Sequence, residues 1–191
     1  MMTQNYSPLM YQTVSKRPDK VKSKGEARTS KFSLEVQAEF SGNVAINNRL
    51  RTNGLPGVAI HGHYPGGEDL NNNVIVTNEA CGNSVDTEDA ATPGPTGVNV
   101  YGFSAITGTV IARNVIKDEE VDIAVKTAAQ VDAHLNDLLG KQRVGVDNLG
   151  TSTINVTENW WRCSHGSGAE GCSGVTGSGV LFTPWLRTPL P

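Results

Sequence analysis

The amino-acid sequence predicts an all-β solenoid, in which short strands stack coil upon coil around one apolar core. Its 191 residues suffice for a single domain, and 21 glycines with 18% charged residues make a composition poor in helix formers. From Phe32 onward, short β-branched stretches alternate with Gly, Asn, Asp and Pro, as in proteins with many short strands. Similar motifs recur at intervals of roughly 20 to 40 residues, which indicates one coil per copy with loops of variable length.

The charge distribution separates a basic N-terminal arm from an acidic body. Residues 1–32 hold seven basic and two acidic residues, a net charge of +5, whereas the rest of the chain has a net charge of −8. We therefore expect a disordered arm over residues 1–32 and a β-solenoid over residues 33–191. An acidic body argues against a nucleic-acid-binding domain. No apolar run is long enough to predict a membrane span or a secretory signal.

A first series of motifs ends in asparagine. Each copy alternates apolar and other residues, and the three copies are Val44-x-Ile46-x-Asn48, Val74-x-Val76-x-Asn78 and Val110-x-Ala112-x-Asn114. The alternation predicts strands whose Val, Ile and Ala side chains point inward. The asparagines are expected at the turns, where stacked amides can satisfy backbone groups as a ladder.

A second series lacks the asparagine and usually lies near a glycine. Its copies are Val58-x-Ile60, Val98-x-Val100, Ile123-x-Val125 and Val144-x-Val146. Two long inserts, residues 62–73 and 80–96, interrupt the repeat and contain turn-forming sequences. We expect these inserts to project from the stack, and the stretch between Gly62 and Thr96 to form the contact face.

The motifs leave two structural questions open. In the last copies, Val131-x-Ala133 and Ile154-x-Val156, the apolar positions shift by one relative to Asn136 and Asn159. Residues 118–140 also fit the 3.6-residue period of a helix, with Gly140 placed for a C-cap. We retain a coil over residues 118–140 because Ile123-x-Val125 continues the second series.

The C-terminal block carries the most specific signal. It reads Asn159-Trp160-Trp161-Arg162-Cys163, then a Gly-rich stretch to Cys172, and then Phe182-Thr183-Pro184-Trp185-Leu186. This block resembles the closing segment of bacterial right-handed parallel β-helix proteins of the broad pectate-lyase-like class. The resemblance implies a right-handed parallel β-helix of about four to six coils, closed by a cap over about residues 159–191.

The same resemblance implies an exported, extracellular or cell-surface protein, and a chain that forms the C-terminal portion of a longer one. In that setting the first coil lacks a cap, so that self-association through it is expected. Trp160, Trp161 and Trp185 would plug the opposite end of the core. Cys163 and Cys172 enclose a short loop and are expected to form a disulfide in an oxidising compartment, whereas Cys81 is expected to be a buried thiol.

Residues that could carry chemistry are few. His61 and His63 project on one side of a strand if it continues that far, with Asp69 as a further metal ligand. Asp86, Glu88 and Asp89 form the densest carboxylate group in a loop, which could take calcium. Neither group has the spacing of a recognised metal motif, so that surface histidines and solvated acids are the simpler interpretation. No catalytic residue and no required cofactor is predicted.

These observations favour a non-catalytic β-helix module with a structural or surface-recognition role. By the family resemblance, its partner would be a polysaccharide or a cell-surface glycan. The alternative is a polysaccharide lyase or glycoside hydrolase that works in an external groove near His61, His63 and Asp86. A third hypothesis is a fragment without independent function.

Overall fold

The computed structural model describes residues 38–39, 41–62, 68–84, 95–128 and 130–191. Every regular element within these ranges is a β-strand, which confirms the all-β class. Three parallel sheets contain most of the strands, and a two-stranded sheet joins β1 (Ala38–Glu39) to β5 (Glu68–Asp69). The predicted arm, residues 1–32, lies outside the described residues.

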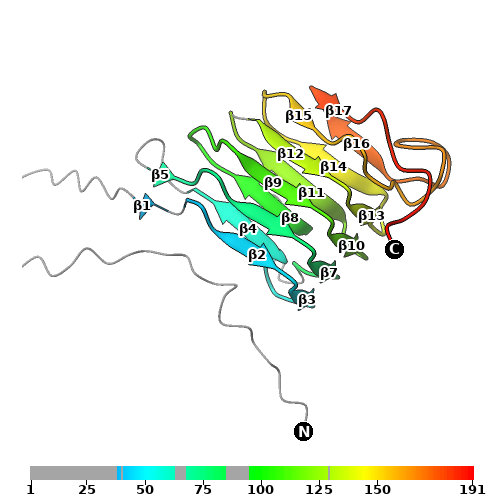
Figure 1. The fold of residues 1–191 in the computed structure, drawn as a ribbon, viewed down its shortest axis with the longest axis horizontal. Coiled ribbons are helices and arrows are strands. Elements are labelled where there is room, and N and C mark those ends of the chain that lie inside the picture. Colours follow the sequence, from blue (N-terminus) through cyan, green and yellow to red (C-terminus); the bar gives the residue numbers. More distant parts are fainter. Residues whose placement is uncertain (1–37, 40, 63–67, 85–94, 129) are drawn as a thin grey trace, which may run out of the picture.

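The three sheets run the length of the molecule (Figure 1). The six-stranded sheet contains β2 (Val44–Ile46), β6 (Val74–Val76), β9 (Thr109–Ala112), β12 (Val131–His134), β15 (Ile154–Asn155) and β17 (Val180–Leu181). The four-stranded sheet contains β3 (Arg49–Arg51), β7 (Glu79–Cys81), β10 (Val115–Lys117) and β13 (Asp137–Leu139). The five-stranded sheet contains β4 (Val58–His61), β8 (Thr96–Tyr101), β11 (Val121–Lys126), β14 (Val144–Asn148) and β16 (Gly174–Gly177).

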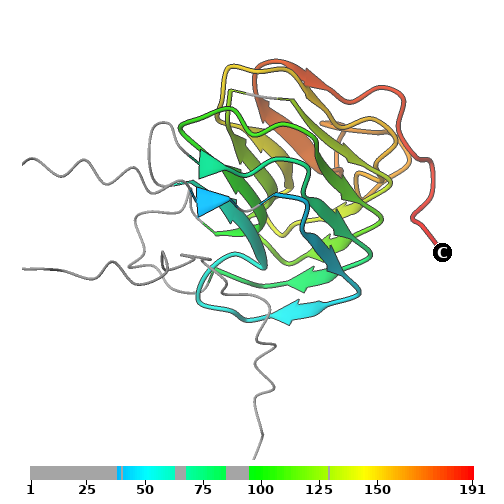
Figure 2. The ribbon, with the colours of Figure 1, turned by 60° about the vertical axis from the view of Figure 1, so that its left-hand side comes forward.

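The chain visits the three sheets in a repeating order, and one such passage is called a circuit. Strands β2, β3 and β4 form one circuit, and β6, β7 and β8 pair with them in parallel in the same order. β9, β10 and β11 then pair in parallel with β6, β7 and β8. Figure 2 shows the three walls around one interior. This topology is compatible with a parallel β-helix.

The interior is a continuous stack of aliphatic side chains. Ile75, Ile111, Ile116, Ile123 and Leu138 are fully buried, and they belong to one apolar cluster along the axis. Each fully buried side chain of this size contributes roughly 1.5–3 kcal/mol. Since no single circuit could bury these side chains alone, neighbouring circuits depend on one another for stability.

The first motif series faces outward, which corrects the prediction from the sequence. Val44 is 59% exposed and Ile46 is 53% exposed, while the residues that point inward are Ala45 and its equivalents Ile75 and Ile111. The cause lies at the corner, because the residue before each asparagine has a left-handed backbone, with φ of 56° at Asn47, 55° at Thr77 and 57° at Arg113. That turn places the asparagine and the residue three positions before it on the inner side.

The later copies obey the same rule. Ala133 and Val156 lie three positions before Asn136 and Asn159, and both are buried. Their corner residues, Leu135 and Glu158, again have positive φ. All five copies therefore have the same register relative to the asparagine. The last copies only appear shifted, because the strands of the first three copies carry apolar side chains on both faces.

The corner between the six- and four-stranded sheets holds an asparagine ladder. Its members are Asn48, Asn78, Asn114, Asn136 and Asn159. In each step the backbone N–H and the Nδ2 of one asparagine donate to Oδ1 of the next, as from Asn78 to Asn114 at 2.8 and 3.0 Å. The Nδ2 of Asn114 also donates to the carbonyl oxygen of Ile75 at 3.0 Å. The ladder thus satisfies the backbone N–H of an asparagine at each step and gives interior carbonyl oxygens such as that of Ile75 an additional donor.

A second ladder lies at the corner between the four- and five-stranded sheets. The N–H of Asn53 donates to Oδ1 of Asn83 at 3.3 Å, and the N–H of Asn83 donates to Oε2 of Glu119 at 2.8 Å. The Nδ2 of Asn83 donates to Oε1 of Glu119 at 2.7 Å and to the carbonyl oxygen of Leu50 at 3.0 Å. A buried glutamate therefore replaces an asparagine in this ladder.

Residues 118–140 form strands and not the rival helix. β11 and β12 lie wholly in this stretch, and β13 ends at Leu139. The second series lines the interior as expected, since Ile60, Val98, Val100 and Val125 are all buried. The last copy of this series, Val144-x-Val146, is displaced by two residues relative to Ile123-x-Val125. Ile123 pairs with Val146 and not with Val144.

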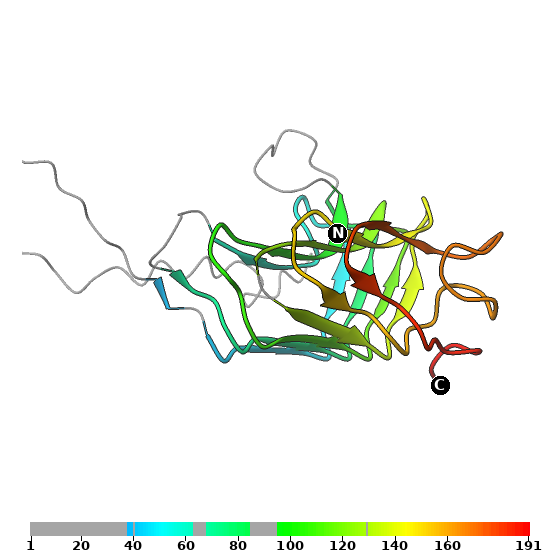
Figure 3. The same ribbon diagram turned by 90° about the horizontal axis from the view of Figure 1, so that it is seen from above.

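The C-terminal segment lies at one end of the stack (Figure 3). Trp161 is fully buried in the apolar cluster, and Phe182 and Trp185 pack against that cluster while partly exposed. Trp160 forms an isolated bridge with Asp137 and is partly exposed. Trp161 thus fills the core at this end, with Phe182 and Trp185 beside it.

Candidate functional site

The outer face of the five-stranded sheet carries a row of three functional side chains. His61, Tyr101 and Lys126 are paired neighbours at the ends of β4, β8 and β11. Each follows directly after an inward residue, namely Ile60, Val100 or Val125, and therefore points outward. Parallel pairing holds the three side chains side by side, at the strand spacing of about 4.8 Å.

Aromatic rings dominate this row. The ring centroids of His61 and Tyr101 lie 4.6 Å apart with an interplanar angle of 54°, and those of Tyr101 and Phe103 lie 5.5 Å apart in an edge-to-face arrangement. The Nζ of Lys126 lies 5.1 Å from the centroid of the Tyr101 ring. Phe103 is 56% exposed, so that its ring is open to an incoming ligand. We call His61, Tyr101, Phe103 and Lys126 the aromatic row.

Asn99 lies beside the aromatic row on the same face of β8. It is two residues before Tyr101, and it pairs with Ala59 and Ala124 of the neighbouring strands. Its side chain is fully buried, and among the described residues neither Oδ1 nor Nδ2 has a hydrogen-bond partner. A buried amide without partners costs about 1–3 kcal/mol and offers one acceptor and two donors to a polar group that reaches it.

Of the metal candidates from the sequence, the structure describes only His61 and Asp69. His61 is in the aromatic row, while His63, Asp86, Glu88 and Asp89 lie outside the described residues. Asp69 accepts hydrogen bonds from the Ser41 hydroxyl and from the Nδ2 of Asn71, which lower the pKa of its exposed carboxyl. Over the ranges that the structure describes, no group of three His, Cys, Asp or Glu side chains could hold a metal ion.

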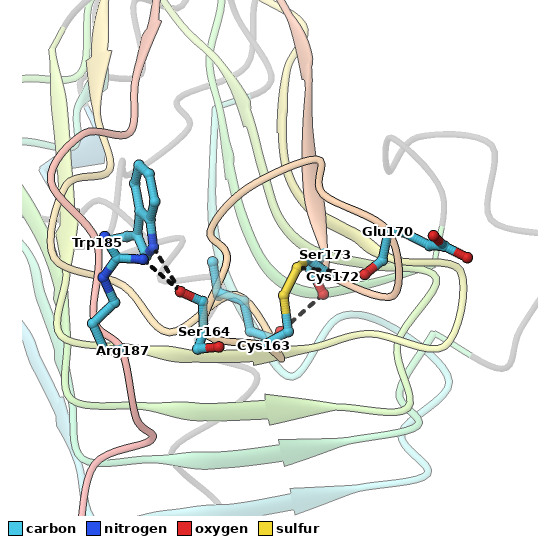
Figure 4. Close-up of a disulfide and its surroundings, with 8 residues drawn as sticks. Cys163, Ser164, Glu170, Cys172, Ser173, Trp185 and Arg187 are labelled. Atoms are coloured by element: carbon cyan, nitrogen blue, oxygen red, sulfur yellow. Dashed lines mark hydrogen bonds between the residues drawn. A yellow bond between two sulfur atoms is a disulfide. The ribbon is translucent and has the colours of Figure 1, made fainter.

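The cysteines have structural surroundings. A disulfide joins Cys163 to Cys172, with the Cα atoms 5.1 Å apart. Figure 4 shows the Trp185 indole and the Arg187 guanidinium donating to the carbonyl oxygen of Ser164 next to this bond. Cys81 is half-buried and not fully buried as the sequence predicted; burial, followed by the nearby carboxylate of Asp118, raises the pKa of its thiol.

The sequence analysis missed Tyr101, Phe103 and Lys126. A signal for two of them existed, because the residue after each pair in the second series points outward. Read in this way, His61, Tyr101 and Lys126 occupy equivalent positions in three successive copies. Phe103 has no such equivalent, and its approach to Tyr101 depends on how the chain leaves β8.

Comparison of the chain with protein-family models, with curated proteins and with solved structures finds no match. In the part of the chain that the structure describes, no helix is long and apolar enough to cross a membrane.

Proposed function

We propose that the chain is a non-catalytic recognition module built on a right-handed parallel β-helix of about four to six coils. In this proposal the aromatic row on the outer face of the five-stranded sheet binds a glycan, on a polysaccharide or at a cell surface. The observation that carries the proposal is the alignment of His61, Tyr101 and Lys126 by strand pairing, with the exposed ring of Phe103 beside them.

The chemistry of the row suits a sugar. An aromatic ring offers an apolar face for the C–H groups of a pyranose, at a small cost in side-chain entropy. The exposed ammonium group of Lys126 adds a cation that hydroxyl or carboxylate groups of a glycan could reach. A few polar groups around an apolar surface are typical of small-ligand sites.

Export to an oxidising compartment is part of the proposal. The Cys163–Cys172 disulfide supports it, because such bonds persist outside the reducing cytosol. The C-terminal segment with Trp161, Phe182 and Trp185 against the core supports the pectate-lyase-like comparison made from the sequence.

Binding to defined oligosaccharides, measured by titration calorimetry, tests the proposal. We expect Phe103→Ala to weaken binding by about 2- to 12-fold, corresponding to about 0.5–1.5 kcal/mol for one aromatic contact. Leu181→Ala is the matched control, because Leu181 is also 56% exposed but lies on the six-stranded sheet. Equal effects of the two substitutions, or no binding to any glycan tested, would reject the aromatic row as the site.

The alternative function is that of a polysaccharide lyase or glycoside hydrolase that would act in an external groove near His61. It predicts release of products from uronate polymers, with or without calcium, where the recognition module predicts binding alone. Turnover that His61→Ala abolishes would favour the enzyme over our proposal.

A further inference from the structure

Two carboxyl groups lie inside the molecule where β10 leads into β11. Glu119 is 1% exposed and Asp122 is 0% exposed. Both oxygens of Glu119 accept hydrogen bonds, from the N–H and from the Nδ2 of Asn83. Glu119 is therefore held as a rung of the second ladder, with donors suited to its ionised form.

Asp122 closes the same ladder from a neighbouring strand. The next circuit has Gly140 at this corner, and its N–H donates to Oδ2 of Asp122 at 3.0 Å. A Cβ on Gly140 would lie 2.8 Å from Oδ1 of Asp122 and 3.1 Å from the carbonyl oxygen of Glu119. The Asp122 carboxyl thus occupies the space that a ladder side chain at position 140 would need.

The other carboxyl oxygen of Asp122, Oδ1, receives no comparable hydrogen bond from the described residues. Oδ1 is buried and has no hydrogen-bond partner in the part of the chain that the structure describes. The Nη1 of Arg162 donates to the carbonyl oxygens of Leu139 and Gly140, at 3.1 and 3.3 Å, and so approaches this corner without pairing with the carboxyl group. Among the described residues, no basic group forms an ion pair with Asp122 within 4.0 Å.

The charged groups around Asp122 come from the connection between β10 and β11 and from the C-terminal segment. Glu119 and Asp118 lie before β11 and repel a negative charge, whereas Arg162 attracts one. Burial has the largest influence and raises the pKa of Asp122 well above its usual range. The hydrogen bond from the Gly140 N–H acts in the opposite direction and lowers this pKa. Burial also raises the pKa of Glu119, while the hydrogen bonds from Asn83 and the charge of Lys141 oppose that shift.

We propose that Asp122 is a proton-dependent latch, which when neutral holds the corner between β10 and β11 against Gly140 and when ionised releases it. An ionised carboxylate with one donor in this interior is costly, and movement of the corner toward water relieves that cost. The protonated form is favoured in the folded state, so the stabilisation is complete below the pKa of an unfolded aspartate. It is lost as the pH rises through the raised pKa of the folded chain. The latch is independent of glycan binding.

NMR of the full chain, labelled with ¹³C and ¹⁵N, tests the latch in two ways. The resonance of the Asp122 carboxyl carbon, assigned by its loss in Asp122→Asn, should report a protonated group at pH values where an unfolded aspartate is ionised. The exchange protection of the Gly140 amide, corrected for intrinsic rates, should fall by about tenfold per pH unit above the folded pKa. The amide of Asn114, which donates to Asn136, serves as an internal reference whose protection should not follow this course.

Asp122→Asn is the decisive variant, because its uncharged Oδ1 can still accept from Gly140 while it can no longer ionise. We expect the protection of Gly140 in this variant to be independent of pH, and Glu119→Gln to keep the dependence at a shifted midpoint. Ordinary aspartate titration of Asp122 in the folded chain would overturn the proposal. An identical pH course of Gly140 protection in the parent and in Asp122→Asn would overturn it as well.

Discussion

Replacement of Asn114 by alanine tests the asparagine ladder most severely. The substitution removes four hydrogen bonds: the two that Oδ1 accepts from Asn78 and the two that Nδ2 donates to Ile75 and Asn136. The buried backbone N–H of Asn78 would then lose its partner, whereas the carbonyl oxygen of Ile75 keeps its place in the ladder between β6 and β9. Since one buried unsatisfied group costs about 1–3 kcal/mol, we expect a loss of about 1–3 kcal/mol in the free energy of unfolding.

Urea denaturation, followed by tryptophan fluorescence and circular dichroism, measures this loss as a lower midpoint at constant slope. The control is Asn155→Ala, because Asn155 is half-buried and the side-chain hydrogen bonds it makes with described residues come from the nearby Thr157. We expect the control to lose about 1 kcal/mol or less. Equal midpoints for Asn114→Ala and the parent would refute the view that the ladder stabilises the interior.

Three further predictions concern stability. Gly145→Ala places a Cβ 2.8 Å from Cζ3 of Trp161, so we expect the fold to lose about 1–3 kcal/mol of stability in a thermal melt. An unchanged melting temperature would show that Trp161 does not pack against Gly145. Replacing both Cys163 and Cys172 by serine should lower the free energy of unfolding by about 2–3 kcal/mol, by the chain-entropy estimate for a separation of 9 residues. A urea midpoint equal to that of the parent would contradict this expectation. A hydrogen bond from Lys117, together with the charges of the neighbouring arginines, lowers the pKa of Glu79. The stabilisation that ionised Glu79 gives to the fold should therefore be present above the pKa of an unfolded glutamate. It should be lost as the pH falls through the lower pKa of Glu79 in the folded chain. Glu79→Gln should reduce that acid dependence at low salt, and an unaltered pH profile would argue against the ion pairs.

The sequence predicts the elements of the fold better than their orientation. Short alternating stretches that end at Asn48, Asn78 and Asn114 suffice to predict strands and a ladder of amides. They do not reveal the inward face, because Val44 and Ile46 lie outside although their spacing resembles that of a core strand. The orientation depends on left-handed corner residues such as Asn47 and Thr77, whose backbone geometry no side-chain pattern fixes.

The candidate site was predictable only in part. His61 stood out as a histidine, but Tyr101 and Lys126 become its neighbours through pairing across 40 and 25 residues of chain. The buried carboxyl of Asp122 was equally hidden, because a sequence of adjacent acidic residues normally indicates a solvated loop. It lies inside because Gly140, in the next circuit, leaves room for it.

The central claim is that successive circuits stack in parallel with the register described. Methyl NOE spectroscopy of the full chain, with labelled Ile, Val and Ala, measures this directly. The stack predicts cross-peaks between Ile75 and Ile111 inside, and between Val76 and Ala112 outside, because these residues pair across β6 and β9. Absence of both, with cross-peaks limited to residues three or four positions apart in the sequence, would contradict the claim.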